Sequence, residues 1–223
     1  MTDKQIVQEY FNNTGFDRWR KIYSDSDQVS RVQLDIREGH QRTIDQVLYW
    51  LKKLPDLQEL EICDVGCGVG SLSVPLAKLG AKKVYASDIS EKMIAEAKQR
   101  AGELENLCFS VNDLENLTGS YDVLACLDVI IHYPTDEALK MLTHLANLTK
   151  KRLIISFAPK NLYYDLLKGI GNLFPGASKT TRAYLHPEKV IKQHLQGLGF
   201  TVQQTEFIAS QFYFARIYDF SKT

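Results

Sequence analysis

From residue 60 onward, short apolar runs alternate with longer stretches in which apolar and polar residues recur at helical spacing. The runs predict strands over residues 60–65, 83–88, 107–111, 121–127 and 151–158. The stretches between them predict helices near residues 71–79, 90–102 and 135–149. Strands that alternate with helices in this way indicate a mostly parallel sheet with helices on both faces, a doubly wound α/β fold.

A different order of elements follows this alternation. A helix is predicted near residues 187–197, because a proline opens the segment and glycines close it. Two apolar runs then cover residues 201–209 and 212–220, with only two residues between them. Strands joined by so short a connection form a hairpin, so one of them must enter the sheet antiparallel to the others.

Two segments lie outside this pattern, and both are expected to cover the sheet. Residues 1–53 are predicted to form a helical lid, with helices over 3–11 and 28–53. Residues 160–186 are predicted to form a second lid, inserted between the fifth strand and the following helix. The core domain is then expected to span residues 54–223 and to carry this insertion.

Composition narrows the possible partners. The chain has 223 residues, enough for one domain with a sizeable core. Lys plus Arg equals Asp plus Glu at 27 each, so the net charge gives no general attraction to nucleic acid. No apolar run reaches the roughly 18 residues of a transmembrane helix. The four cysteines lack Cys-x-x-Cys spacing, so neither a disulfide framework nor a protein-bound metal is predicted, and a reducing compartment is expected.

The glycine-rich stretch Asp64-Val65-Gly66-Cys67-Gly68-Val69-Gly70 joins the first predicted strand to the first predicted helix. Glycine at every second position lets the backbone turn tightly and approach a ligand. Asp88 ends the second predicted strand, where a carboxylate can accept both hydroxyls of a ribose. Together these features resemble the S-adenosylmethionine site of class I methyltransferases, which are Rossmann-like. That resemblance gives cofactor-binding roles to Asp64, Gly66, Cys67, Gly68, Gly70 and Asp88.

Two other readings of the glycine loop stay open at this point. Glycine-rich turns between a strand and a helix occur in many α/β folds, and Asp88 could be only a solvated acid at a strand end. A nicotinamide dinucleotide is the second alternative, but its binding loops have Gly-x-Gly-x-x-Gly spacing. A pyrophosphate also needs free N–H groups at a helix N-terminus, and Asp64 would repel it.

The rest of the cofactor pocket is expected at the carboxyl ends of the parallel strands. By resemblance to the fold, Asp113 accepts the adenine amino group and the Leu114 amide reaches a ring nitrogen. Ile89 and Met93 could flank the adenine, and the Leu127 carbonyl would hold the ammonium of the donor. The alternative for Asp113 is a helix cap or turn residue.

His132 lies just beyond the fourth predicted strand, in a loop that normally faces the sulfonium and the acceptor. A histidine there can orient an acceptor oxygen or take a proton. The alternative is a surface histidine packed beside Tyr133. His40, His144, His186 and His194 have no comparable positional argument.

Both predicted lids combine aromatic and basic residues. Arginine can grip a carboxylate through two hydrogen bonds, and aromatic faces can cover a large flat ring system. The lids therefore suit a large, flat, apolar substrate that carries carboxylates. The alternative is that these aromatic residues only pack the lids against the sheet.

Several longer motifs make the resemblance more specific. The sequence resembles the magnesium protoporphyrin IX methyltransferases from about residue 5 to residue 223. The motifs that carry this resemblance are Tyr10 to Trp19, Asp35 to Gln41, Asp64 to Leu72, Asp128 to Asp136, and Phe174 to Tyr184. The resemblance implies chlorophyll biosynthesis, with methyl transfer from S-adenosylmethionine to the 13-propionate of magnesium protoporphyrin IX. The products would be the monomethyl ester and S-adenosylhomocysteine, and the magnesium would belong to the substrate.

The same resemblance implies roles for residues of the lids. It gives Tyr23 and His132 the task of orienting the carboxylate and handling its proton, although Tyr23 could be only a packed aromatic. Substrate contacts are expected from Trp19, Arg37, Tyr163, Lys179 and Arg182. Contact with the porphyrin-binding subunit of magnesium chelatase is a further implication.

A hydrophobic substrate also makes peripheral contact with a photosynthetic membrane plausible. The expected location is the cytoplasm or that membrane in a cyanobacterium, or the plastid for a mature processed protein. Three other functions stay open: methylation of a quinone or small phenol, a non-catalytic adaptor that carries tetrapyrrole, and, less favoured, RNA methylation.

Overall fold

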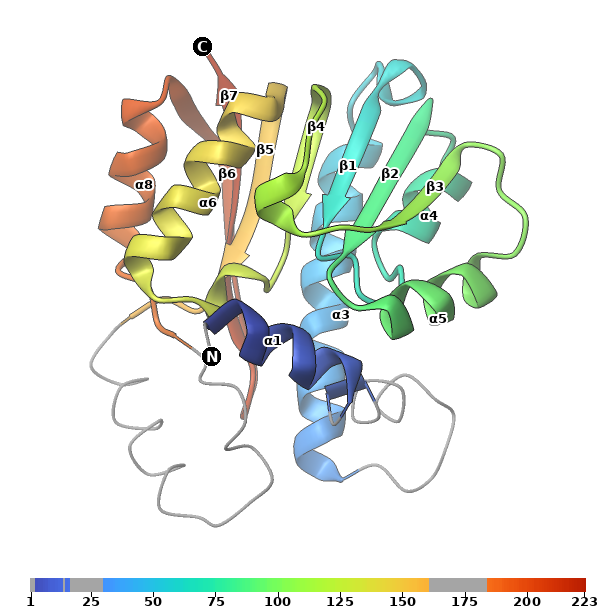
Figure 1. Cartoon of the computed structure of the whole chain (residues 1–223). Coiled ribbons are helices and arrows are strands. Elements are labelled where there is room, and N and C mark those ends of the chain that lie inside the picture. Colours follow the sequence, from blue (N-terminus) through green and yellow to red (C-terminus); the bar gives the residue numbers. More distant parts are fainter. Residues whose placement is uncertain (1–2, 14, 17–29, 161–183) are drawn as a thin grey trace.

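The computed structural model describes residues 3–13, 15–16, 30–160 and 184–223. Its strands are β1 (Glu61–Val65), β2 (Lys83–Asp88), β3 (Leu107–Val111), β4 (Tyr121–Cys126), β5 (Thr149–Phe157), β6 (Phe200–Ala209) and β7 (Phe214–Lys222). They form one seven-stranded sheet in the order β3-β2-β1-β4-β5-β7-β6 (Figure 1). Only β7 runs antiparallel to its neighbours, as expected for a strand that enters through a hairpin.

Helices cover both faces of this sheet. They are α1 (Asp3–Asn12), α3 (Arg31–Lys52), α4 (Ser73–Lys78), α5 (Glu91–Ala101), α6 (Thr135–Leu148) and α8 (Glu188–Gly197). Short 3₁₀ turns are η1 (Leu57–Glu59), η2 (Leu114–Asn116) and η3 (Ile130–His132). The helix starts follow local capping chemistry, since Ser30 forms a capping box with Gln33 and the Ser90 hydroxyl accepts the Met93 amide.

The core is divided between the two faces because successive strand residues point in opposite directions. Cys63 of β1 joins a cluster with α6 and α8, whereas Ile62 joins one with α3 and α4. The central strands are therefore apolar on both faces, which explains why the sequence shows them as continuous apolar runs.

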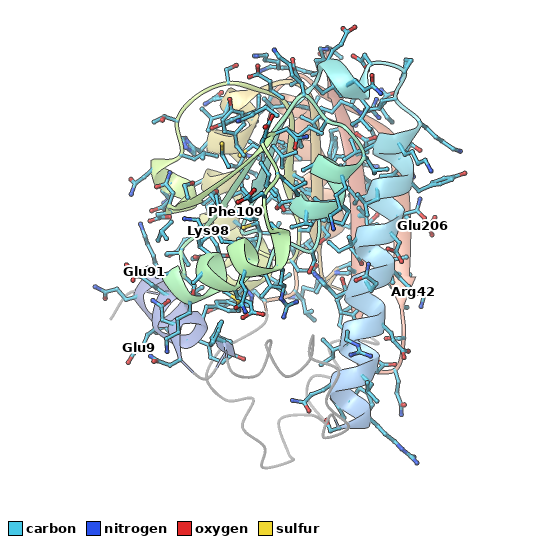
Figure 2. All side chains as sticks on the ribbon, turned by 90° about the vertical axis from the view of Figure 1, so that its right-hand side faces the viewer. Glu9, Arg42, Glu91, Lys98, Phe109 and Glu206 are labelled. Atoms are coloured by element: carbon cyan, nitrogen blue, oxygen red, sulfur yellow. The ribbon has the colours of Figure 1, made fainter. Side chains whose placement is uncertain are left out.

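Helix α3 is attached to the connection between β6 and β7. Asp35 accepts hydrogen bonds from the Ser210 hydroxyl (2.7 Å) and the Gln211 amide (3.2 Å). One turn further along, Gly39 faces the ring of Tyr213, and a Cβ there would lie 2.3 Å from Cδ1 of that ring. Figure 2 shows α3 beside β6, with Arg42 and Glu206 on the two elements.

The segments assigned to the first lid pack against the core. Val7 of α1 is buried in the cluster that includes α6, and α1 lies beside α5. Val47 of α3 is fully buried against the other face of the sheet. The division into a lid of residues 1–53 and a core of residues 54–223 stays a prediction. No helix in the described ranges is both long and apolar enough to cross a membrane.

Candidate active site

A pocket opens at the carboxyl ends of β1, β2 and β4, where ligands bind in open α/β sheets. The glycine loop forms one wall of this pocket, and side chains that follow β2 and β4 form others. Its lining combines the glycine loop, the ends of β2 and β4, and α1 and α3. The predicted residues on it are Asp64, Gly66, Cys67, Gly68, Asp88, Ile89, Met93, Asp113, Leu114, Leu127 and His132.

The glycine loop has the backbone conformation that its sequence predicts. Gly66, Gly68 and Gly70 have φ angles of 72°, 54° and 82°, a region that side chains rarely adopt. The Gly66 and Cys67 amides donate to the Ser87 carbonyl at 2.7 and 3.0 Å, which fixes the loop to the end of β2. Gly70 does not line the pocket, since its α-carbon faces the Val74 side chain.

Asp88 is held in one orientation at the mouth of this loop. One carboxylate oxygen accepts the Gly68 amide and the other accepts the Ser90 amide, both at 2.9 Å. Burial raises the pKa of Asp88, and these two hydrogen bonds oppose the shift. Because each oxygen has a second lone pair, the fixed carboxylate can still accept the two hydroxyls of a ribose.

Asp64 lies deeper and is only 3% exposed. Its carboxylate accepts the hydroxyl of Ser73 on α4. Burial raises the pKa of Asp64 to about 6, with the Ser73 hydrogen bond opposing the shift and the negative charge of Asp88 adding to it. A cationic group bound nearby would favour the ionised form of this carboxylate.

The side of the pocket predicted for adenine is built from β2, β3 and α1. Asp113 accepts the Glu115 amide at 3.1 Å as the cap of η2, and it pairs with Lys4 of α1. The capping role considered from the sequence is therefore present, and the same residue also lines the pocket. The Ser90 hydroxyl donates to the Phe11 carbonyl at 3.0 Å, which ties α1 to this side.

Asp128 is the centre of a hydrogen-bond network at the end of β4. Its backbone has a φ of 57°, and its carboxylate accepts His40 Nδ1 (3.0 Å), the Ser156 hydroxyl (2.6 Å) and the Tyr213 hydroxyl (2.7 Å). Burial alone would raise the pKa of Asp128, but the His40 interaction, with the other two hydrogen bonds, holds it below the usual value.

His132 occupies η3, directly after this network. Its Nδ1 atom is buried and has no hydrogen-bond partner among the described residues. The edge of the Phe11 ring packs against it, with centroids 5.2 Å apart. Burial lowers the pKa of His132 to about 4, and the charge of Asp128 only partly offsets this effect. The imidazole is therefore neutral at physiological pH, so it can donate one hydrogen bond without forming an ion pair.

Several predicted substrate contacts cannot be compared with the structure. Trp19, Tyr23, Tyr163, Lys179 and Arg182 lie outside the described residues. Arg37 is half-buried on α3, one turn before His40, and does not line the pocket. Among the described residues, no group of three or more His, Cys, Asp or Glu side chains could hold a metal ion.

No positional argument from the sequence pointed to His40, which lines the pocket. It also missed the carboxylate of Asp128, since only the neighbouring carbonyl was considered. Two of the other histidines make hydrogen bonds for which the sequence had offered no argument. His186 is fully buried between Thr135 and the Ile130 carbonyl, and His194 contacts Thr143 at 2.8 Å. The available signal for His40 was its place within the Asp35 to Gln41 motif.

Comparison with known proteins finds relatives over almost the whole chain. A family model described as the C-terminus of magnesium-protoporphyrin IX methyltransferase matches residues 126–222, and a methyltransferase domain model matches residues 62–152. A magnesium-protoporphyrin O-methyltransferase from Synechocystis is 55% identical, over 97% of this chain and 95% of its own length. The chloroplastic magnesium protoporphyrin IX methyltransferase of Arabidopsis thaliana is 54% identical, over 96% of this chain and 70% of its own length.

A solved structure extends this similarity to three dimensions. The crystal structure of the Synechocystis magnesium protoporphyrin IX methyltransferase with bound S-adenosylhomocysteine superposes with a TM-score of 0.91. The two chains are 52% identical, and the match covers 99% of this chain and 100% of the other. The fold class predicted from the sequence is confirmed.

Proposed function

This chain belongs to the magnesium protoporphyrin IX methyltransferase family, and we propose that it methylates one propionate of magnesium protoporphyrin IX. The predicted family, enzyme class and dependence on S-adenosylmethionine are confirmed by these relatives. The observation that carries the proposal is that one pocket contains the glycine loop with Asp88 and also His132, whose Nδ1 has no hydrogen-bond partner among the described residues. The binding site for the methyl donor and a histidine that can contact the methyl acceptor therefore line the same pocket.

The residues of the pocket fit the methyl donor. Asp88 would hold the ribose, and Asp64 offers a carboxylate for the ammonium. Ile89 and Met93 would flank the adenine, and the Leu114 amide would reach a ring nitrogen. Glycine is required at position 66 by packing as well, since a Cβ there would lie 2.2 Å from the Val129 side chain. When bound, S-adenosylmethionine supplies an electrophilic methyl group on a positively charged sulfur.

The protein must mainly align the acceptor and exclude water, because a carboxylate is already ionised near neutral pH. Alignment of this kind can lower a barrier by roughly 7–11 kcal/mol. The neutral ring of His132 suits an orienting role, since it can donate one hydrogen bond to a carboxylate oxygen. An ion pair at that oxygen would weaken it as a nucleophile. Arg37 and the cations of the insertion are therefore proposed to hold the other propionate.

The decisive experiment uses the purified protein, S-adenosylmethionine with a deuterated methyl group, and magnesium protoporphyrin IX. Mass spectrometry should show one labelled methyl group on the porphyrin, released by ester hydrolysis, together with S-adenosylhomocysteine. A small phenol and a quinone serve as competing acceptors. Methylation of either of these without transfer to the porphyrin would contradict the proposal, and binding without transfer would favour the adaptor.

We further propose that the chain contacts the porphyrin-binding subunit of magnesium chelatase and a photosynthetic membrane surface. Both ideas come from the family and from the hydrophobic substrate. Residues 162–173, whose sequence could form an amphipathic helix at a membrane surface, lie outside the described residues. Co-sedimentation with vesicles that carry anionic lipid, with and without the chelatase subunit, tests both ideas, and a protein that stays in the supernatant in both cases contradicts them.

A further inference from the structure

Resting on the proposed function, we propose that His186 is a positioning residue that holds the turn bearing His132 and so sets the place of that ring in the pocket. His186 itself does not line the pocket. The two histidines then act in series. His132 contacts the propionate, and His186 fixes the backbone from which the His132 side chain extends.

The ring of His132 gains little orientation from contacts of its own. Its Nδ1 atom is buried and has no hydrogen-bond partner in the part of the chain that the structure describes, and Phe11 packs against it at an interplanar angle of 78°. The backbone around it is better fixed, since Ile130 and Tyr133 are both buried in the core. The place of the ring in the pocket therefore depends on the backbone of η3.

One imidazole joins the two ends of the segment that carries His132. Nε2 of His186 lies 3.0 Å from the Ile130 carbonyl, where η3 begins, and Nδ1 lies 3.1 Å from the hydroxyl of Thr135, where α6 begins. A carbonyl only accepts hydrogen bonds, so Nε2 carries the hydrogen and Nδ1 of the neutral ring accepts from Thr135. Burial lowers the pKa of His186, with the Ile130 hydrogen bond opposing the shift, and this favours the neutral ring.

His186 is in turn attached to the end of the sheet. Its amide donates to the Ala158 carbonyl at 2.9 Å, and its carbonyl accepts the Lys160 amide at 2.8 Å, so it pairs with the residues that follow β5. The Tyr184 amide donates to the Ile131 carbonyl at 2.7 Å, which adds a second hydrogen bond to η3. The turn beneath His132 is therefore connected to the end of β5 through this short segment.

Displacement of this turn should affect methyl transfer more than donor binding. His132 is proposed to orient the acceptor, whereas the glycine loop and Asp88 have hydrogen bonds of their own, to the Ser87 carbonyl and from the Ser90 amide. Misplacement of an aligning group by about 1 Å can lower a rate by about 100-fold. Loss of the His186 side chain should therefore lower kcat and leave donor affinity almost unchanged.

Two amide substitutions separate the hydrogen bonds of His186. Asparagine can accept from Thr135 at the position of Nδ1 but does not reach the Ile130 carbonyl, whereas glutamine places an amide N–H near the position of Nε2. With both substrates saturating, His186→Asn should lower kcat about 10–100-fold, and His186→Gln should recover most of this loss, to within about threefold of the wild type. Calorimetric affinity for S-adenosylhomocysteine should stay within about twofold in both variants.

The same type of residue pair, about two turns further along α6, provides the control. His194 of α8 contacts Thr143 of α6 at 2.8 Å and is likewise not part of the pocket lining. His194→Asn should keep the kcat and the donor affinity of the wild type. A fall in kcat as large as that of His186→Asn would show a general loss of packing and would overturn the proposal.

A double-mutant cycle tests whether His186 acts through His132. His132→Ala should itself lower kcat, and the addition of His186→Asn should then lower it by less than about threefold, because the ring that His186 positions is gone. Thr135→Val, which loses only the hydroxyl that donates to Nδ1, is a second variant that applies even if His186→Asn does not fold. Its kcat should fall about threefold or more in the wild-type background and by less in His132→Ala.

Four results would overturn the role of His186. They are effects that multiply in the double variants, an unchanged kcat in His186→Asn, a kcat in His186→Gln as low as in His186→Asn, and a parallel loss of donor affinity. An unreduced kcat in His132→Ala would also overturn it, because no positioned ring would then be needed. Wild-type protein that makes no ester would instead contradict the proposed function itself.

Discussion

Replacement of Gly39 by alanine tests whether α3 is docked on the Tyr213 ring as the structure indicates. In an exposed helix, Gly→Ala stabilises by about 1 kcal/mol. Here the new Cβ would lie 2.3, 2.6 and 2.7 Å from three carbons of Tyr213, so the ring must move by more than about 1 Å to reach ordinary contact. That movement breaks the 2.7 Å hydrogen bond from Tyr213 to the charged Asp128, worth about 1.5–3 kcal/mol.

The balance predicts a net loss of about 1–2 kcal/mol for Gly39→Ala. Each kcal/mol corresponds to about 2–4 °C for a chain of this size, so thermal unfolding of the protein resolves the change. Gly197→Ala is the matched control, because no atom of the described residues lies within 4 Å of its Cβ position at the end of α8. It should be neutral or slightly stabilising.

The same substitution in a Tyr213→Ala variant tests whether the contact with the ring causes the loss of stability. In Tyr213→Ala protein, Gly39→Ala should no longer destabilise, since the ring that opposes the Cβ is gone, and a coupling of about 1–2 kcal/mol should appear in the double-mutant cycle. If Gly39→Ala is as stable as Gly197→Ala, or equally harmful without the Tyr213 ring, the docking of α3 on Tyr213 is wrong.

Three further predictions concern the pocket. Asp88→Asn should weaken S-adenosylhomocysteine binding by about 10–100-fold in calorimetry, because each lost hydrogen bond to a charged group is worth about 1.5–3 kcal/mol, and unchanged affinity would refute the ribose assignment. His132 has its pKa lowered from 6.5 to about 4 in the folded protein, so its contribution to stability is complete above pH 6.5 and is lost as the pH falls toward 4. The free energy of unfolding, measured in urea as the pH is lowered, should therefore fall by about 2–3 kcal/mol less in His132→Gln than in the wild type. An identical dependence of this free energy on pH in both proteins would contradict the burial of this ring. Ser90→Ala should weaken the attachment of α1 to α5 by about 1–2 kcal/mol, because the hydrogen bond to the Phe11 carbonyl is lost. Amide exchange over residues 3–12 should then be faster, and unchanged exchange there would contradict this attachment.

Most of the fold could be predicted because its signals are local. Each central strand is buried on both faces, so runs such as Val123 to Cys126 appear as continuous apolar segments. The loop signals were equally local: the glycines marked the positive φ angles at residues 66, 68 and 70, and Ser90 marked the start of α5. The cofactor side of the pocket follows from these segments, since most of the residues predicted to bind the cofactor lie at or shortly after the end of a predicted strand.

The remaining part of the site depends on contacts between distant residues. His40 and Asp128 are 88 positions apart, and Tyr213 is 85 positions from Asp128. Neither pairing leaves a periodic or spacing signal in one sequence. The left-handed backbone conformation of Asp128 is enforced by these same contacts, so the local sequence around this residue did not predict it. The sequence likewise did not indicate a role for Gly39, because its small size matters only when the Tyr213 ring is packed against it.

The order of strands imposes an order of assembly. The chain makes β6 before β7, yet β7 lies between β5 and β6 in the sheet. Strand β7 must therefore be synthesised before β6 can join the sheet. The pairing of β7 with β5 joins residues far apart in the sequence, and pairing of this kind is slow. Tyr213 arrives with that hairpin. A nascent chain could thus fold its glycine loop early, while the histidine and aspartate opposite it become ordered only in the final stage of maturation.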